Sequence, residues 1–260
     1  MRARRRKGRR RITLMLFSTV ASLTVLAASL AYYLSIPQDL SSSSNREGGT
    51  GASRAVIVDG IGLTKPNPAF LEGVRETLIQ AGLNVDVYSG SQVTMKLLDS
   101  IQGYSLIVLR VHSAVDAKYR FLYLFSTEAY NSERYLLEQL YGAYREAYTF
   151  DRSEGPYFAL RADLLGDEDG LKGSTIILMG CNGTNSNHAI ERLFERGVES
   201  IIAWDGYVSL EYTDEATLTL LKLVYIEGLS YGDAVQRVME SMGSDPTWGS
   251  RLIYLANPEI

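Results

Sequence analysis

Cysteine and histidine are both scarce in this sequence. It contains one cysteine, Cys181, and two histidines, His112 and His188, in 260 residues. A single cysteine excludes a disulfide within the chain and a zinc site built from several cysteines. Two histidines argue against a histidine-rich metal site. The composition therefore directs attention to chemistry that requires neither a metal nor a cofactor.

Acidic residues are missing from residues 1–11, MRARRRKGRRR, which hold eight Lys or Arg. The whole chain has a formal net charge of −4. Without those eight residues, 18 basic residues face 30 acidic ones, so residues 12–260 carry −12. Nucleic-acid binding requires a basic face. The acidic remainder of the chain therefore argues against nucleic acid as a partner.

Charge is absent from residues 12–36, a run of 25 residues that ends before Pro37. As a helix this run is about 37 Å long at ~1.5 Å per residue, which is enough to cross a hydrocarbon core of about 30 Å. The basic flank predicts that residues 1–11 stay in the cytoplasm. We therefore expect an uncleaved signal anchor that spans the cell membrane once and places the C-terminal part outside the cytoplasm.

A cleaved signal peptide is the alternative for the same residues, because Ser29, Leu30 and Ala31 form a small-x-small cleavage pattern. The apolar run is long for a signal peptide, whose apolar region has about 7–15 residues. Residues 37–53 are rich in serine and glycine, which is typical of a flexible linker. Residues 54–260 are expected to form the folded domain.

Apolar runs and amphipathic stretches alternate from residue 54 onward. Strands are predicted at residues 55–60, 84–88, 104–111, 121–126, 157–161, 174–179, 198–204 and 251–255, and helices at residues 67–82, 93–101, 131–148, 187–196, 210–228 and 230–242. Strand, helix, strand, helix, strand in succession indicates parallel pairing with right-handed crossovers. We therefore predict a three-layer α/β/α fold with a mostly parallel sheet.

The two rarest side chains each follow a predicted core strand. Cys181 comes after the β-branched run 174–179 and lies among Gly180, Asn182 and Gly183, which favour a tight loop. His112 comes directly after the run 104–111. Reactive groups gather at the carboxyl ends of parallel strands. If the two strands are neighbours, Cys181 and His112 lie side by side at this edge of the sheet.

A thiol beside an imidazole is a combination that cleaves acyl bonds. The thiolate is the nucleophile, and the histidine supplies a base or a stabilising cation. Backbone N–H groups in the loop after the strand are candidate donors to the oxyanion. The dipole of the helix predicted at residues 187–196 is expected to help lower the pKa of Cys181.

The order strand–His–insertion–strand–Cys, followed by a helix, a strand that ends at Trp204 and the tail DEATLTLLKLVYIEGLSYGDAVQRV, resembles the caspase-like cysteine peptidases of clan CD. The C-terminal part is most similar to the CHAT type. The resemblance covers residues 54–257. It implies a cysteine endopeptidase without a cofactor that acts on a peptide or protein substrate. The predicted anchor would place this activity outside the cytoplasmic membrane.

Residue by residue, the resemblance makes Cys181 the nucleophile and His112 the catalytic histidine. It places the oxyanion hole at the backbone N–H groups of Ser113 and Cys181, although the family usually has glycine where this chain has Ser113. Some members carry an acid two residues before the cysteine as part of the S1 pocket, but this chain has Met179 there.

The S1 wall in this family comes from the loop after the first strand and from the end of the strand beyond the cysteine. Those places hold Asp59, Lys65, Trp204 and Asp205. Asp205 next to Trp204 would suit a substrate with Arg or Lys before the cleaved bond. The alternative for Asp205 is a cap on the following turn, and Asp59 is either a pocket acid or a hydrogen-bonded strand end.

Two other functions remain open from the sequence. An amidotransferase-like thiol hydrolase wants small residues two before and two after its cysteine, and Met179 fails the first of these. Its histidine would also follow the cysteine, where only His188 stands. The second alternative is an inactive caspase-like domain that serves as a surface interaction module.

Overall fold

The computed structural model describes residues 53–150, 152 and 154–260. The predicted basic tail, the membrane anchor at residues 12–36 and nearly all of the linker lie outside the described residues. Within the described part, no helix is long and apolar enough to cross a membrane. The described residues cluster as one compact unit.

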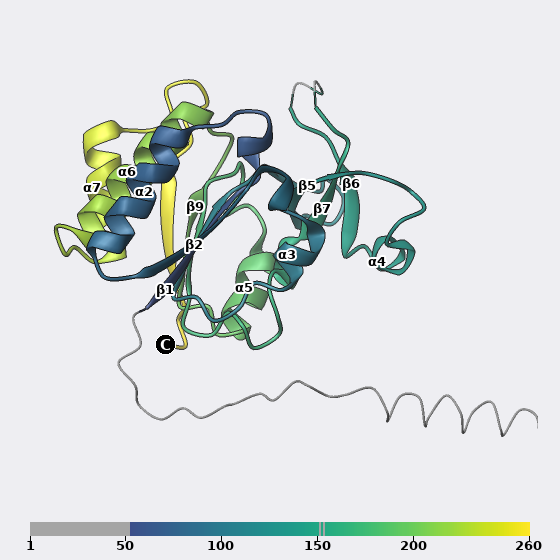
Figure 1. Ribbon diagram of the computed structural model, residues 1–260, viewed down its shortest axis with the longest axis horizontal. Helices are drawn as coiled ribbons and strands as arrows, with labels where there is room; N and C mark the ends of the chain where they lie inside the picture. The colour runs from purple at the N-terminus through teal and green to yellow at the C-terminus, as the bar shows by residue number, and fades with distance from the viewer. Residues whose placement is uncertain (1–52, 151, 153) are drawn as a thin grey trace, which may run out of the picture. The chain divides into compact units, whose positions relative to one another are not determined.

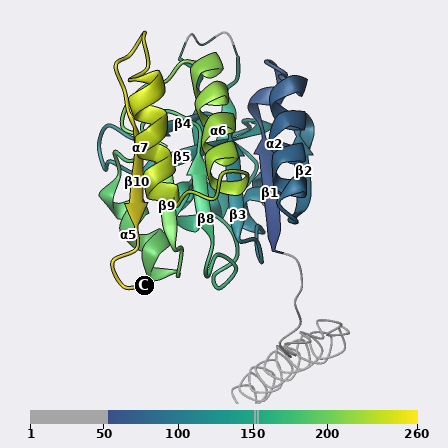
Figure 2. The ribbon, with the colours of Figure 1, turned by 90° about the vertical axis from the view of Figure 1, so that its left-hand side faces the viewer.

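A six-stranded sheet forms the centre of the described domain, in the order β10-β9-β8-β3-β1-β2. Its strands are β1 (Arg54–Asp59), β2 (Asn84–Ser89), β3 (Leu106–Arg110), β8 (Thr175–Leu178), β9 (Ser200–Trp204) and β10 (Leu252–Ala256). All neighbouring pairs are parallel except β9 and β10. The predicted mostly parallel sheet is thus confirmed, and Figure 2 shows its strands side by side.

Helices cover both faces of this sheet (Figure 1). One face carries α2 (Pro68–Gln80), α6 (Leu210–Tyr225) and α7 (Tyr231–Met242), and the other carries α3 (Met95–Asp99) and α5 (Asn187–Glu195). Two apolar cores follow from the alternation of strand side chains. In β3, Leu106 and Val108 join the core beneath α2, α6 and α7, whereas Ile107 and Leu109 join the core on the opposite face.

A smaller antiparallel sheet fills the insertion between the two strands that precede His112 and Cys181. Its order is β4-β5-β7-β6, with β4 (Ser113–Val115), β5 (Leu122–Ala129), β6 (Tyr144–Ala147) and β7 (Tyr157–Arg161). Phe158 and Leu160 of β7 and Leu122 and Leu124 of β5 are buried in the core on the α3 and α5 side of the large sheet. The strand β4 begins at the residue after His112, so the small sheet is attached directly to the candidate site.

The helix predicted over residues 131–148 is wrong. Only α4 (Leu136–Leu140) is helical there, and residues 144–147 form β6, which pairs with β7. Tyr135 and Gly142 both have positive φ and bound the short helix on either side. Leu136, Leu137 and Leu140, which were expected to be buried, are 63–77% exposed. The strand pairing of β6 therefore overrides the helical pattern of this stretch.

Candidate active site at the ends of β3 and β8

Pairing of β3 with β8 brings His112 and Cys181 to the same edge of the sheet. The two strands are parallel neighbours, with Leu109 opposite Leu178. Met179 N donates to Leu109 O at 3.0 Å, so the register continues past the end of β8. His112 and Cys181 each lie three residues beyond this matched pair. The adjacency predicted from the sequence is therefore present in the backbone.

Ser113 joins the histidine segment to the cysteine segment. Its Oγ donates to the carbonyl oxygen of Cys181 at 2.7 Å. Gly180 is required at this crossing, because a Cβ there would lie 2.3 Å from Ser113 Oγ and 2.5 Å from Val111 O. The backbone carbonyl of Val111 cannot rotate away as a side chain can. The two segments are thus packed at a distance that only glycine permits.

The backbone N–H of Ser113 points toward the cysteine segment. Phe125 N donates to His112 O at 2.9 Å, and Asp116 N donates to Phe121 O at 2.8 Å. Hydrogen-bonded and non-bonded pairs alternate along an antiparallel ladder. Ser113 and Leu124 are therefore a non-bonded pair, and the Ser113 N–H faces away from β5. On that side the Cβ position of Gly180 is 3.0 Å from Ser113 N.

Cys181 is half-buried, and its thiol is held in the neutral form. The Sγ atom lies 4.0 Å from the carbonyl oxygen of Val208. Burial raises the pKa of Cys181, and the negative charge of Asp245 adds to this against a smaller opposing effect of the backbone at Val208. The lowered pKa expected from the sequence is therefore wrong, because desolvation of the thiol is the largest influence on that pKa and raises it. In the resting protein the sulfur is a thiol that needs a base to become a nucleophile.

The pH dependence of alkylation tests this state of the thiol. Because the pKa of Cys181 is raised, the rate with iodoacetamide is expected to climb about tenfold per pH unit from pH 7 and to continue past the ordinary thiol pKa of about 8.5. The same chain unfolded in guanidinium should level off near that ordinary value. A plateau of the folded rate at acidic pH would instead show a resting thiolate–imidazolium pair.

His112 borders an open pocket of about 290 Å³. The His112 ring is half-buried and lies 6.0 Å from the ring of Phe125, centre to centre. The pocket has apolar residues and charged residues of both signs, and it is lined by Ile61, Lys65, His112, Thr149, Phe150, Glu154, Leu210 and Glu211. Its walls thus include the loop after β1, as the resemblance implied, and the first turn of α6.

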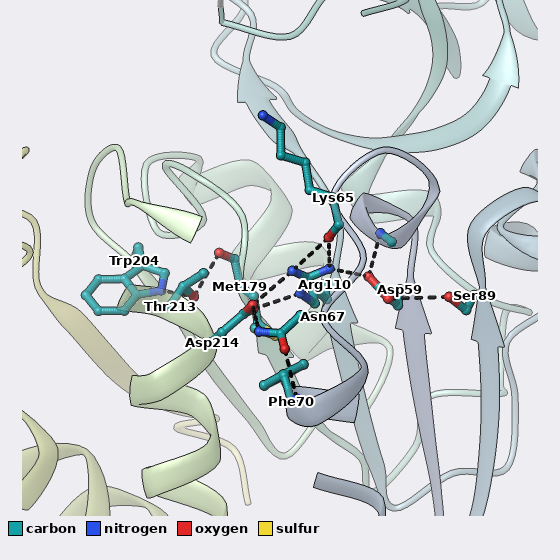
Figure 3. A network of polar contacts seen from close by, with 11 residues as sticks. Asp59, Lys65, Asn67, Phe70, Ser89, Arg110, Met179, Trp204, Thr213 and Asp214 are labelled. Atoms are coloured by element: carbon teal, nitrogen blue, oxygen red, sulfur yellow. Dashed lines mark hydrogen bonds and ion pairs between the residues drawn. The ribbon is translucent and has the colours of Figure 1, made fainter. Parts of the chain in front are cut away.

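Asp59 is a hydrogen-bonded strand end beneath this pocket and not part of its wall. Its side chain is fully buried and accepts from Arg110 Nη1 at 2.7 Å. Arg110 also forms a bidentate pair with Asp214, at 2.7 and 2.9 Å. Figure 3 shows Arg110 between the two carboxylates. Burial alone would lower the pKa of Arg110, but these two ion pairs outweigh it and raise that pKa.

This buried group, Asp59, Arg110 and Asp214, links the segments that surround the site. Both terminal nitrogens of Arg110 also lie 3.3 Å from the carbonyl oxygen of Lys65, in the loop that lines the pocket. Asn67, which caps α2, donates to Asp214 on α6 at 2.9 Å. The sequence did carry a signal for the group, since Arg110 is a charged residue in an otherwise apolar strand and such a charge needs a buried partner.

Trp204 is also fully buried and does not reach a surface where substrate binds. Its Nε1 donates to Thr213 Oγ1 at 2.9 Å, and Thr213 Oγ1 donates to Met179 O at 3.1 Å. Trp204 therefore fixes α6 against the cysteine segment. Asp205, the next residue, is exposed, and its Oδ1 accepts from Arg251 N at 2.7 Å. This carboxylate thus accepts from the backbone just before β10, and not from the following turn that the capping alternative named.

His188 belongs to a separate part of the structure. It lies in the first turn of α5, and its Nε2 is 3.5 Å from Asp163. Within the described ranges, no group of three or more His, Cys, Asp or Glu side chains is placed to hold a metal ion.

Comparison with known proteins leaves the chain without a family assignment. No protein-family model and no curated protein matches its sequence.

Proposed function

We propose that this chain is a cysteine peptidase with a caspase-like domain, in which Cys181 attacks the peptide carbonyl and His112 transfers the proton. The observation that carries the proposal is the β3–β8 register, which brings the backbone segments of Cys181 and His112 to the same edge of the sheet. His112 also borders an open pocket. A membrane anchor at residues 12–36, with residues 54–260 outside the cytoplasm, is part of the same proposal. Its support is the uncharged run and its basic flank.

The proposed reaction follows from the state of the thiol. His112 takes the proton of Cys181 as Sγ adds to the carbonyl carbon, because the thiol is neutral at rest. The N–H groups of Ser113 and Cys181 receive the oxyanion. His112 then gives its proton to the leaving amine, which breaks the C–N bond and leaves a thioester on Cys181. Water, deprotonated by His112, hydrolyses this thioester and restores the thiol.

The charges around the pocket favour a basic residue before the cleaved bond. Glu154 and Glu211 line the pocket against one cation, Lys65. Thr64 Oγ1 donates to Glu154 at 2.8 Å, so Glu211 is the carboxylate better placed to receive a substrate cation. Asp205 is exposed and has one oxygen used by Arg251. If Asp205→Ala and Glu211→Gln both leave cleavage after Arg unchanged, the proposed preference for a basic residue before the cleaved bond is wrong.

Cleavage of a mixed peptide library tests the proposal. The full-length chain in detergent is incubated with the library beside Cys181→Ala, and new peptide ends are read by mass spectrometry. We expect cuts by the unaltered chain alone, enriched after Arg or Lys. No cuts by a folded chain would contradict the proposal.

A non-catalytic interaction module is the second candidate, and a specific observation favours it. The pKa of Cys181 is raised, so its thiol is stable in the neutral form. The Ser113 hydroxyl donates to the carbonyl of Cys181, so the histidine and cysteine segments are also held together without a substrate. A module would cleave no peptide, with or without His112. In a peptidase, His112→Ala slows cleavage because the base that receives the thiol proton is gone.

A further inference from the structure

Three aromatic side chains from different parts of the chain meet at the surface near the site. Phe150 lies between β6 and β7, Tyr207 between β9 and α6, and Trp248 between α7 and β10. Their ring centres are 5.3–5.8 Å apart, in tilted and edge-on arrangements. They are nevertheless 76%, 47% and 45% exposed. We call Phe150, Tyr207 and Trp248 the aromatic cluster.

The aromatic cluster is continuous with both halves of the candidate site. Phe150 lines the same pocket as His112. Tyr207 precedes Val208, whose carbonyl oxygen is 4.0 Å from Cys181 Sγ. The cluster therefore adjoins the pocket through Phe150, and Tyr207 is next in sequence to the residue whose carbonyl lies near the thiol.

Buried hydrogen bonds hold the backbone that carries two of the three rings. Asp245 is 1% exposed and accepts from Trp248 N at 2.7 Å and from Ser209 N at 2.8 Å. Ser250 Oγ donates to Tyr207 O at 2.6 Å. The Tyr207 and Trp248 segments are thus tied to each other independently of their rings. Rigid, exposed aromatic rings beside a pocket are suited to receive an apolar side chain with little loss of conformational freedom.

We propose that Phe150, Tyr207 and Trp248 form a subsite for an aromatic or large aliphatic side chain of the peptide substrate, adjacent to the residue at the cleaved bond. This rests on the proposed function. The cluster carries no charge of its own, so its preference is separate from that of the pocket with Glu211. An apolar substrate side chain that packs against the rings removes apolar ring surface from water, which favours binding.

The preference is measured with the full-length chain and a peptide library in which each position is varied. We expect Phe, Tyr, Trp or Leu to be at least about 10-fold favoured over Ala at one fixed position relative to the cut. Phe150→Ala and Trp248→Ala should each reduce that preference while cleavage continues. Tyr141→Ala is the matched control, because Tyr141 is exposed to the same 76% but lies outside the cluster. Cleavage without such a preference would contradict the proposed subsite but would still support the proposed peptidase activity.

Tryptophan fluorescence tests the subsite without any cleavage. The chain has two tryptophans, and Trp204 is fully buried, so quenching by acrylamide reports on Trp248. Full-length Cys181→Ala is titrated with acetylated alanine hexapeptides that carry one phenylalanine at successive positions. At least one is expected to shield Trp248 more than the all-alanine hexapeptide, and Phe150→Ala should abolish the difference.

The two measurements separate the two claims. Shielding of Trp248 by a phenylalanine peptide without any cleavage would keep the binding site and contradict the peptidase. Equal shielding by the phenylalanine and alanine peptides would overturn the subsite, whatever the cleavage result. Trp248→Phe must remove the response in either case, because Trp204 has no exposed surface to shield.

Discussion

Replacing His112 with alanine is expected to lower kcat/KM about 10²–10⁴-fold for a peptide that the unaltered chain cleaves. The neutral thiol of Cys181 has no proton acceptor once the imidazole is removed, and the leaving amine has no proton donor. Cys181→Ala is expected to remove cleavage altogether, since the sulfur that forms the intermediate is absent. Steady-state kinetics of the full-length chain on one peptide, with circular dichroism to confirm folding, measures both effects.

His188→Ala is the matched control for the histidine substitution. His188 is the chain's other histidine, and its side chain is 42% exposed on α5 beside Asp163. Its removal should change kcat/KM by less than about twofold, as expected for a surface substitution away from the reacting atoms. Similar losses for His112→Ala and His188→Ala would reject the assignment of His112.

Arg110→Met is expected to lower the free energy of unfolding by about 3–5 kcal/mol. Methionine fills much of the same volume but leaves Asp59 and Asp214 buried without their cation. Denaturant unfolding of the full-length chain gives the change in the free energy of unfolding, when both chains show the same linear dependence of that free energy on denaturant concentration. Because Arg110 also anchors the Lys65 carbonyl, some loss of activity is expected in addition.

Two further variants distinguish the buried ion pairs from an ordinary arginine contact. Arg54→Met breaks a pair with Asp86 in which both side chains are 44–49% exposed, and it should cost at most about 1 kcal/mol. Adding Asp59→Asn and Asp214→Asn to Arg110→Met should recover part of the lost stability, because no uncompensated charge then remains. Equal losses for Arg54→Met and Arg110→Met would contradict this account.

The sheet and the placement of His112 and Cys181 were predictable because they follow from strong local patterns. The apolar runs at residues 104–111 and 174–179 are long enough to identify core strands, and parallel strands put their carboxyl ends at one edge. Each run also ends in a rare reactive residue. The observed β3 and β8 are neighbours, as this reasoning required. The finer resemblance to caspase-like peptidases stays a proposal.

The insertion before Cys181 was not predictable from periodicity. Its leucines at 136, 137 and 140 are spaced as on a helix that packs against a core, yet they lie at the surface. A left-handed residue at Tyr135 and the pairing of β6 with β7 decide the structure there, and neither leaves a clear local pattern.

The environment of the site depends on contacts between residues far apart in the chain. Trp204 was placed correctly at the end of a strand, but its burial depends on Thr213 and α6. The pKa of Cys181 depends on burial and on Asp245, 64 positions away in the sequence. Phe150, Tyr207 and Trp248 come from three separate connections between elements, and their rings meet only in the folded domain. Such encounters require the fold and not the sequence pattern alone.

Detection of an acyl group on Cys181 tests the central claim most directly. The full-length chain is mixed with an ester of a cleaved peptide, quenched in acid during the first turnover, and examined by intact mass and peptide mapping. We expect a mass increase equal to the acyl part of the peptide, located on Cys181, released by hydroxylamine and much reduced in His112→Ala. Turnover of the ester with no adduct on Cys181, or with the adduct on another residue, would contradict the account.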